Sequence, residues 1–168
     1  MITTTRRSRS AALALLLAAA LAGCKSNDHP SDAAGEHRMY LPSEIQWKDA
    51  SNSLPPGAKM AVLDGDPTKD GPFCMRLKFP DGYKVMPHWH PKTERVTVIS
   101  GTLNLGFGDT FDKDATHALP TGTYGYWTPG VRHFAWTQGE TILQLNGIGP
   151  WQIIYVNAVD DPRKAKAE

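Results

Sequence analysis

The stretch Gly82-Tyr-Lys-Val-Met-Pro-His88-Trp-His90-Pro-Lys-Thr-Glu94 is the most informative part of this chain. Two histidines that are two residues apart on an extended strand project from the same face. A carboxylate four residues further on, past a proline, can return to that face from the next strand. Imidazoles and a carboxylate that converge inside a sheet are ligands that suit a borderline divalent metal. The stretch therefore predicts a metal site lined by β-strands.

The rest of the folded part also reads as β-structure. From Ala58 onward, short apolar or β-branched runs alternate with turn signals, and no segment keeps a helical period. The predicted strands cover residues 59–63, 73–79, 83–88, 95–99, 102–107, 124–127, 133–137, 141–145 and 152–156. Ser100-Gly101 is predicted to form a tight hairpin. Residues 109–120 are predicted to be a surface loop that carries an exposed His117. The predicted fold class is an all-β, antiparallel sandwich or barrel.

Two sequence motifs resemble those of the cupin superfamily. The first cupin motif is glycine, five residues, His-x-His, three residues, glutamate, six residues and glycine. It is matched position for position by Gly82, His88, His90, Glu94 and Gly101. The second motif is matched less fully, by Gly122, Pro129, Gly130 and His133. Its proline is displaced by one residue, so that Thr128 stands where a proline is expected, and Thr137 replaces its asparagine.

The resemblance covers roughly residues 58–156, and it implies a single cupin barrel, also called a double-stranded β-helix or jelly roll. It further implies one divalent metal ion, held by the side chains of His88, His90, Glu94 and His133. Zn, Cu, Mn, Fe and Ni all remain open. Glu94 is either a fixed ligand or a base that leaves the metal, and no other catalytic residue can be assigned.

Strand alternation predicts which neighbours of the ligands face the metal. Met86 should point inward with His88 and His90, and Trp89 outward. Ala135 and Thr137 should point inward with His133, while Phe134 and Trp136 point outward and need cover. That cover would come from residues 39–47 or from a second subunit, as in a homodimer. Thr137 would hydrogen-bond a ligand or a bound water, or simply fill space. Candidates for the cavity mouth, none preferred, are Tyr124, Tyr126, Trp127, Gln144, Asn146 and Trp151.

The N-terminus resembles a bacterial lipoprotein signal. Arg6, Arg7 and Arg9 precede an apolar run over residues 11–22, which is too short to span a bilayer. Cys24 follows at the position that such a signal lipidates. The alternatives are an ordinary signal peptide and, because of the arginine pair, twin-arginine export. We expect an exported protein that is anchored through Cys24 on the periplasmic side of a membrane.

The segments expected are a signal over residues 1–23, a flexible tether over 24–37, a cupin domain over 38–157 and a polar tail over 158–168. Loss of the signal leaves 15 basic residues against 17 acidic ones, a net charge of −2. No basic stripe remains, so nucleic acid is not an expected partner. Cys74 would be the one unmodified thiol, which excludes an intramolecular disulfide.

Fold does not choose among the functions of cupins. One hypothesis is a metal-dependent enzyme, a dioxygenase or an isomerase, acting on a small molecule. The other is a non-catalytic module that binds a metal or a small ligand at the membrane surface. A complete ligand set favours the enzyme. The lack of an arginine grouped with the histidines opposes it, because Arg132 has the wrong strand parity to share the direction of His133.

Overall fold

A computed structural model describes residues 37–164. The strands among these residues all belong to one compact unit, which begins at Met39. The predicted signal segment, Cys24 and the tether before His37 lie outside the described residues. Within the described part, no helix is long and apolar enough to cross a membrane.

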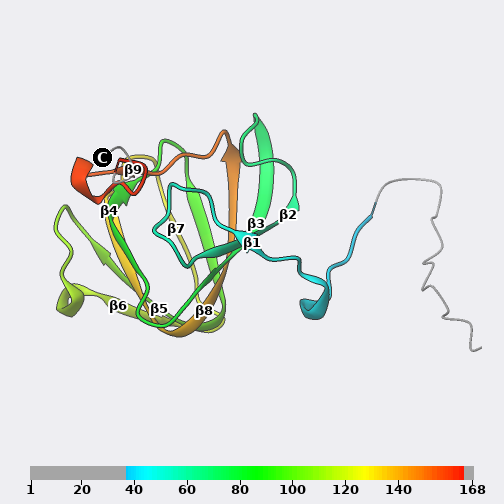
Figure 1. Cartoon of the computed structure of the whole chain (residues 1–168), viewed down its shortest axis with the longest axis horizontal. Coiled ribbons are helices and arrows are strands. Elements are labelled where there is room, and N and C mark those ends of the chain that lie inside the picture. Colours follow the sequence, from blue (N-terminus) through cyan, green and yellow to red (C-terminus); the bar gives the residue numbers. More distant parts are fainter. Residues whose placement is uncertain (1–36, 165–168) are drawn as a thin grey trace, which may run out of the picture. The chain divides into compact units, whose positions relative to one another are not determined.

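The described residues of this unit form antiparallel strands and three short 3₁₀ helices (Figure 1). The strands are β1 (Lys48–Asp49), β2 (Lys59–Asp64), β3 (Gly71–Phe79), β4 (Lys84–Trp89), β5 (Glu94–Phe107), β6 (His117–Pro120), β7 (Tyr124–Trp127), β8 (His133–Gly149) and β9 (Ile154–Tyr155). The 3₁₀ helices are η1 (Pro42–Glu44), η2 (Lys113–Ala115) and η3 (Ala158–Asp160). The all-β prediction is therefore confirmed.

Two long strands, β5 and β8, run side by side and take part in both layers of the barrel (Figure 1). The first half of β8 pairs with β4 and with the second half of β5, which also carries β6. The second half of β8 pairs with β3 and with the first half of β5, which also carries β7. The two layers thus share their central strands, as the predicted cupin barrel requires.

The corner of β5 lies at Gly101. The predicted hairpin at Ser100-Gly101 is wrong, because β5 continues through these residues with two register shifts against β8. Gly101 has a φ of +79°, and a Cβ atom there would lie 2.5 Å from the carbonyl oxygen of Glu140. A bulge needs such a residue, since only glycine adopts this backbone without strain. The glycine of the motif therefore bends a strand and does not end one.

The interior follows the predicted alternation along β3, where Phe73, Met75, Leu77 and Phe79 are all buried. Cys74 lies on the opposite face and is half-buried. Burial raises the pKa of the Cys74 thiol, which disfavours the reactive thiolate. Cys74 is thus a structural residue of the outer face.

A bulge in β4 changes one predicted direction. The register shifts between Val85, which is opposite Ala135, and His88, which is opposite His133. As a result Val85 lines the cavity of the barrel, whereas Met86 packs against the core from its edge. The inward direction predicted for Met86 is wrong, because simple alternation does not survive an extra residue.

The outward aromatic residues of β8 are covered by the segment between β5 and β6. Phe134 packs against Phe111, with ring centroids 5.3 Å apart, and is 1% exposed. Trp136 donates from Nε1 to the hydroxyl oxygen of Thr116 at 3.2 Å. The cover predicted from residues 39–47 or a second subunit is therefore supplied by residues that were expected to form a plain loop. His117 is exposed, as predicted, but it opens β6.

The first residues of the expected C-terminal tail pack on the domain. Asp161 is 8% exposed and forms an ion pair with Arg163 at 2.7 Å. The guanidinium of Arg163 also donates to the carbonyl oxygen of Ile153 at 3.1 Å. These contacts hold residues 161–163 against one end of the barrel.

Candidate metal centre

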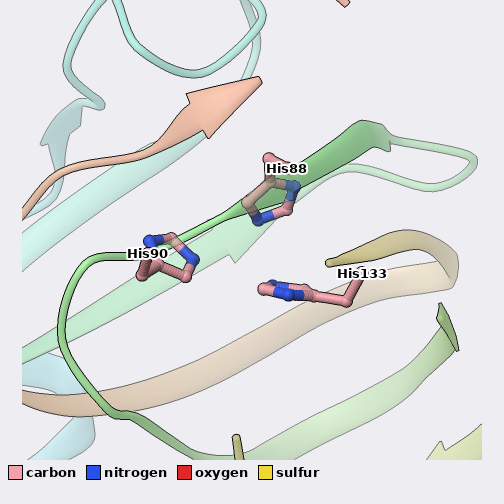
Figure 2. A group of neighbouring side chains, drawn as sticks. All are labelled: His88, His90 and His133. Atoms are coloured by element: carbon pink, nitrogen blue, oxygen red, sulfur yellow. The ribbon is translucent and has the colours of Figure 1, made fainter. Parts of the chain in front are cut away.

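Three histidines from two neighbouring strands meet at one place inside the barrel. His88 lies near the end of β4, His90 follows directly after it, and His133 opens β8 opposite His88. Their side chains are 5%, 5% and 2% exposed. One ring nitrogen from each lies within 4.8 Å of the others, and Figure 2 shows the three rings turned toward one another. The histidines predicted from both motifs are therefore brought together.

Each imidazole is oriented by a backbone carbonyl. Nδ1 of His88 lies 2.7 Å from the oxygen of Met86, and Nδ1 of His133 lies 3.0 Å from that of Val131. Nδ1 of His90 lies 2.7 Å from the oxygen of Gln152. A carbonyl oxygen can only accept, so each Nδ1 carries the proton and each Nε2 keeps its lone pair. Metal-binding histidines are commonly fixed in this way.

Glu94 opens β5 and places one carboxylate oxygen beside two of these nitrogens. Its Oε2 lies 3.2 Å from Nε2 of His90 and 3.3 Å from Nε2 of His133. Ligand atoms at about 2.1 Å from a shared metal lie about 3.0 to 3.4 Å from one another in octahedral or tetrahedral geometry. The separations seen here match those of neighbouring ligands.

The buried atoms of the cluster fit a divalent cation. Nε2 of His90 is fully buried and, among the described residues, has no hydrogen-bond partner. Its distance to Glu94 is short, but both atoms are acceptors, so the contact does not satisfy either of them. Three imidazole nitrogens and one carboxylate oxygen form a donor set that suits first-row divalent metals. The three histidines form the group whose ligand atoms all lie within 4.8 Å of one another; Glu94 is not part of that group, and its Oε2 lies beside His90 and His133.

The electrostatics of the cluster favour the deprotonated ligands. Burial, followed by the neighbouring His133 and His90, holds the pKa of His88 well below its ordinary value. Burial raises the pKa of Glu94, but its contacts with His90 and His133 lower it by more, so that the net pKa is lowered. A neutral imidazole and an ionised carboxylate are the forms that bind metal.

Two tryptophans flank the ligands. Trp127 lies opposite Glu94 on β7, is 8% exposed and donates from Nε1 to Glu94 Oε2. The ring of Trp151 stacks on that of His90 with centroids 4.4 Å apart and an interplanar angle of 21°. Both were among the unranked candidates for the cavity mouth, and both line the cavity. Of the other candidates, Tyr124 and Tyr126 are 59% and 63% exposed.

Thr137, which replaces the asparagine of the second motif, uses its hydroxyl for hydrogen bonds to the backbone. Its hydroxyl donates to the oxygen of Pro80 at 2.7 Å and accepts from the N–H of Tyr83 at 3.0 Å. The residue is 1% exposed and fastens the turn that precedes β4. Neither predicted role, contact with a ligand or water or simple filling of space, describes these bonds.

Arg132 points away from the cluster, as its parity predicted, and forms an ion pair with Asp109 at the surface.

The carbonyls of Val131 and Gln152 and the bond from Trp127 to Glu94 were not predicted from the sequence. Every residue has a backbone carbonyl, so the residue types do not show which carbonyls accept these bonds. The Trp127 bond follows from the register of β5 and β7, which a sequence pattern does not fix.

A cavity of about 290 Å³ adjoins the ligands. His88, His90, Glu94 and His133 line one part of it, and residues from both layers of the barrel enclose the remainder. Ligand cavities commonly start at about this volume. The metal centre is thus next to a space that could hold a small organic molecule.

Comparisons with known proteins agree with this architecture. A germin-like protein of rice is 34% identical over 90 residues, a match that covers 53% of this chain and 40% of the relative. The polyketide cyclase RemF from Streptomyces resistomycificus has a similar fold, with a TM-score of 0.64 and 13% identity over 79% of this chain and 94% of the cyclase. An acetylacetone dioxygenase from Acinetobacter johnsonii gives a TM-score of 0.56 and 14% identity, over 75% and 82% of the two chains. Residues 16–152 match the model of a family described as a domain of unknown function, DUF4437, so the chain belongs to that family and, by its fold, to the cupin superfamily.

Proposed function

We propose that this protein is a metal-dependent enzyme that uses dioxygen to oxidise a small organic molecule. One observation carries the proposal. Three Nε2 lone pairs, each fixed by a carbonyl on the far side of its ring, point to a common centre at the edge of a cavity of about 290 Å³. A purely structural metal would not need an adjoining space of that size.

The roles of the residues follow from the geometry. His88, His90 and His133 would hold the metal through Nε2, and Glu94 would hold it through Oε2. When bound, such a metal can polarise a substrate oxygen or react with dioxygen through positions that the protein leaves open. Trp127 keeps Glu94 in place by donating to its carboxylate. The burial of the four ligand side chains, which are 2% to 7% exposed, strengthens each of these interactions.

The cavity offers few other groups for proton transfer. Apart from the four proposed ligands, the ionisable residue that lines it within the described part of the chain is Arg163, whose guanidinium is paired with Asp161. Any proton transfer by the protein therefore falls to Glu94. An oxidation centred on the metal needs less acid–base assistance than an isomerisation does, which is why we prefer the dioxygenase to the isomerase.

The acetylacetone dioxygenase that shares this fold makes β-diketones one substrate class to test. The same scarcity of basic groups favours a second candidate, a non-catalytic module that binds a metal and a small ligand. The two candidates differ in whether oxygen is consumed.

The experiment is to prepare metal-free protein and load it in turn with Fe²⁺, Mn²⁺, Cu²⁺, Ni²⁺ and Zn²⁺. Elemental analysis should find one metal ion per chain. Oxygen uptake is then measured with phenols, β-diketones and sugars. Uptake that needs both a redox-active metal and one substrate class supports the enzyme. Saturable binding of a ligand without oxygen uptake for any metal supports the binding module and rejects the enzyme.

We also propose that the protein is exported and anchored through lipid on Cys24, on the periplasmic side of a membrane. The basic head, the short apolar run and the cysteine at its end support this. Cys24→Ser should move the protein from the membrane fraction to a soluble fraction of the periplasm. Cys74→Ser is the matched control, since it removes a thiol but leaves the signal intact. Retention of Cys24→Ser on membranes would reject the anchor.

A further inference from the structure

The part of the cavity away from the metal ligands is walled by aliphatic side chains. Val85, Leu103, Leu105 and Ala135 come from one layer of the barrel, and Leu143 and Leu145 from the other. All six are buried. A volume of about 290 Å³ equals that of about ten water molecules in the liquid. Water in such a space would find few polar partners along these walls.

The polar residues of the lining lie where the cavity meets solvent. Ser51, Thr68 and Gln152 are exposed residues of the loops at the barrel mouth. They can hydrate the entrance, but they do not belong to the buried interior. The cavity is therefore polar at its rim and at the ligands, and apolar between and beyond them.

The lining lacks a free cation in the described part of the chain. Arg163 donates from Nε and from one terminal nitrogen to the carboxylate of Asp161, at 2.7 and 2.8 Å, and to the oxygen of Ile153. Its charge is thus already balanced by a neighbouring anion. A carboxylate that lies against the aliphatic walls, away from the proposed metal, would have to lose its hydration without gaining a partner, which is costly in a buried site.

We propose that the cavity takes a molecule with an oxygen-bearing end for the metal and an uncharged hydrocarbon or aromatic body for the aliphatic walls. A charged body or a free sugar does not fit these walls. The orientation of the molecule rests on the proposed function. The preference for an apolar body does not, because it depends only on the walls. Burial of apolar surface favours an apolar body, and the lack of a partner along the aliphatic walls disfavours a charge on that body.

A matched pair of ligands tests this class. Benzoylacetone carries two oxygens in a 1,3 arrangement and a phenyl ring on one carbonyl carbon, and phenylmalonate carries two carboxylates in a 1,3 arrangement and a phenyl ring on the carbon between them. The metal-free protein is first titrated with N-phenyl-1-naphthylamine, an uncharged apolar dye whose fluorescence rises in apolar surroundings. We expect one saturable site per chain. Benzoylacetone should displace the dye, and phenylmalonate and glucose should not.

Ala135→Phe is designed to fill the interior, because Ala135 lies on the wall between Val85 and Leu105. It should weaken dye binding by about tenfold or more. Ala118→Phe makes the same change at an exposed position of β6 and should leave dye binding unchanged. Circular dichroism checks that both variants fold. The comparison of the two ligands uses the natural chain and stands even if Ala135→Phe does not fold.

The outcomes separate this proposal from the proposed function. Absence of saturable dye binding, or displacement by phenylmalonate as strongly as by benzoylacetone, would overturn the apolar substrate class. Dye binding with the expected displacement, together with no oxygen uptake by the metal-loaded protein, would uphold the class and reject the oxidase chemistry.

Discussion

The two motif segments, residues 82–101 and 122–137, supply the same centre in different ways. The first provides three of the four proposed ligands and fits its pattern at every fixed position. The second provides only His133 as a ligand, and it departs from its pattern at Thr128 and Thr137. The structure shows that the departures left the ligand in place, while Thr137 took up bonds to the backbone of the first segment. A ligand position tolerates change around it as long as the strand register is kept.

The largest effect should come from a ligand of the first segment. His90→Ala removes one of three nitrogens and frees the carbonyl of Gln152, so metal content should fall from one ion per chain to near zero. The melting temperature in the presence of metal should fall as well, because the metal joins strands of both layers. Elemental analysis and thermal unfolding measure this. His117→Ala, at an exposed position, is the control, and unchanged stoichiometry in His90→Ala would remove this residue from the ligand set.

A smaller loss of metal should follow from Glu94→Gln. The amide keeps an oxygen near His90 and His133 but loses the negative charge that attracts a cation. Affinity should fall between the values for His90→Ala and the natural chain, with one ion per chain still bound at saturation. Competition with a chromogenic chelator gives the dissociation constants. A loss as large as that of His90→Ala would make Glu94 an equal partner of the histidines.

Thr137→Val separates stability from metal binding in the second segment. The valine has nearly the same shape but cannot donate to Pro80 or accept from Tyr83, although the weaker 3.4 Å bond between those two residues remains. The free energy of unfolding of the metal-free protein should fall by about 2 kcal/mol. Urea unfolding measures it, and metal stoichiometry should not change. Thr137→Ser restores the hydroxyl and should recover most of the loss; a valine variant as stable as the natural chain would contradict the role of the bonds.

The smallest effect expected is that of Trp127→Phe. Phenylalanine keeps an aromatic ring against His133 but cannot donate to Glu94. Loss of a group that orients a ligand should weaken metal affinity by about tenfold. The chelator competition measures this as well. Trp136→Phe, which loses its bond to Thr116 on the outer face, is the matched control. Equal effects in the two variants would mean that Trp127 acts on stability and not on the ligand.

The sequence was sufficient to predict the parts of this centre that depend on residue type and spacing. His88, His90 and His133 were predicted together, and most strands of the barrel were predicted nearly in place, whereas β1 was not predicted and β6 was predicted to be part of a loop. The hairpin at Ser100-Gly101 and the inward direction of Met86 were wrong for one reason: both positions are bulges. Whether a bulge forms at a given residue depends on packing between strands that are far apart in the sequence. The cover over Phe134 depends equally on such distant packing.

The carbonyl of Gln152 and the ring of Trp151 both hold His90, and both residues also line the cavity. An organic molecule that contacts Gln152 or Trp151 would therefore also affect the His90 ring that would bind the cation. Binding of the organic molecule and binding of the cation are then thermodynamically linked. If the organic molecule changes the affinity for the cation by some factor, the cation changes the affinity for the organic molecule by the same factor. In such a molecule, a change in metal supply would alter how strongly a bound organic compound is retained.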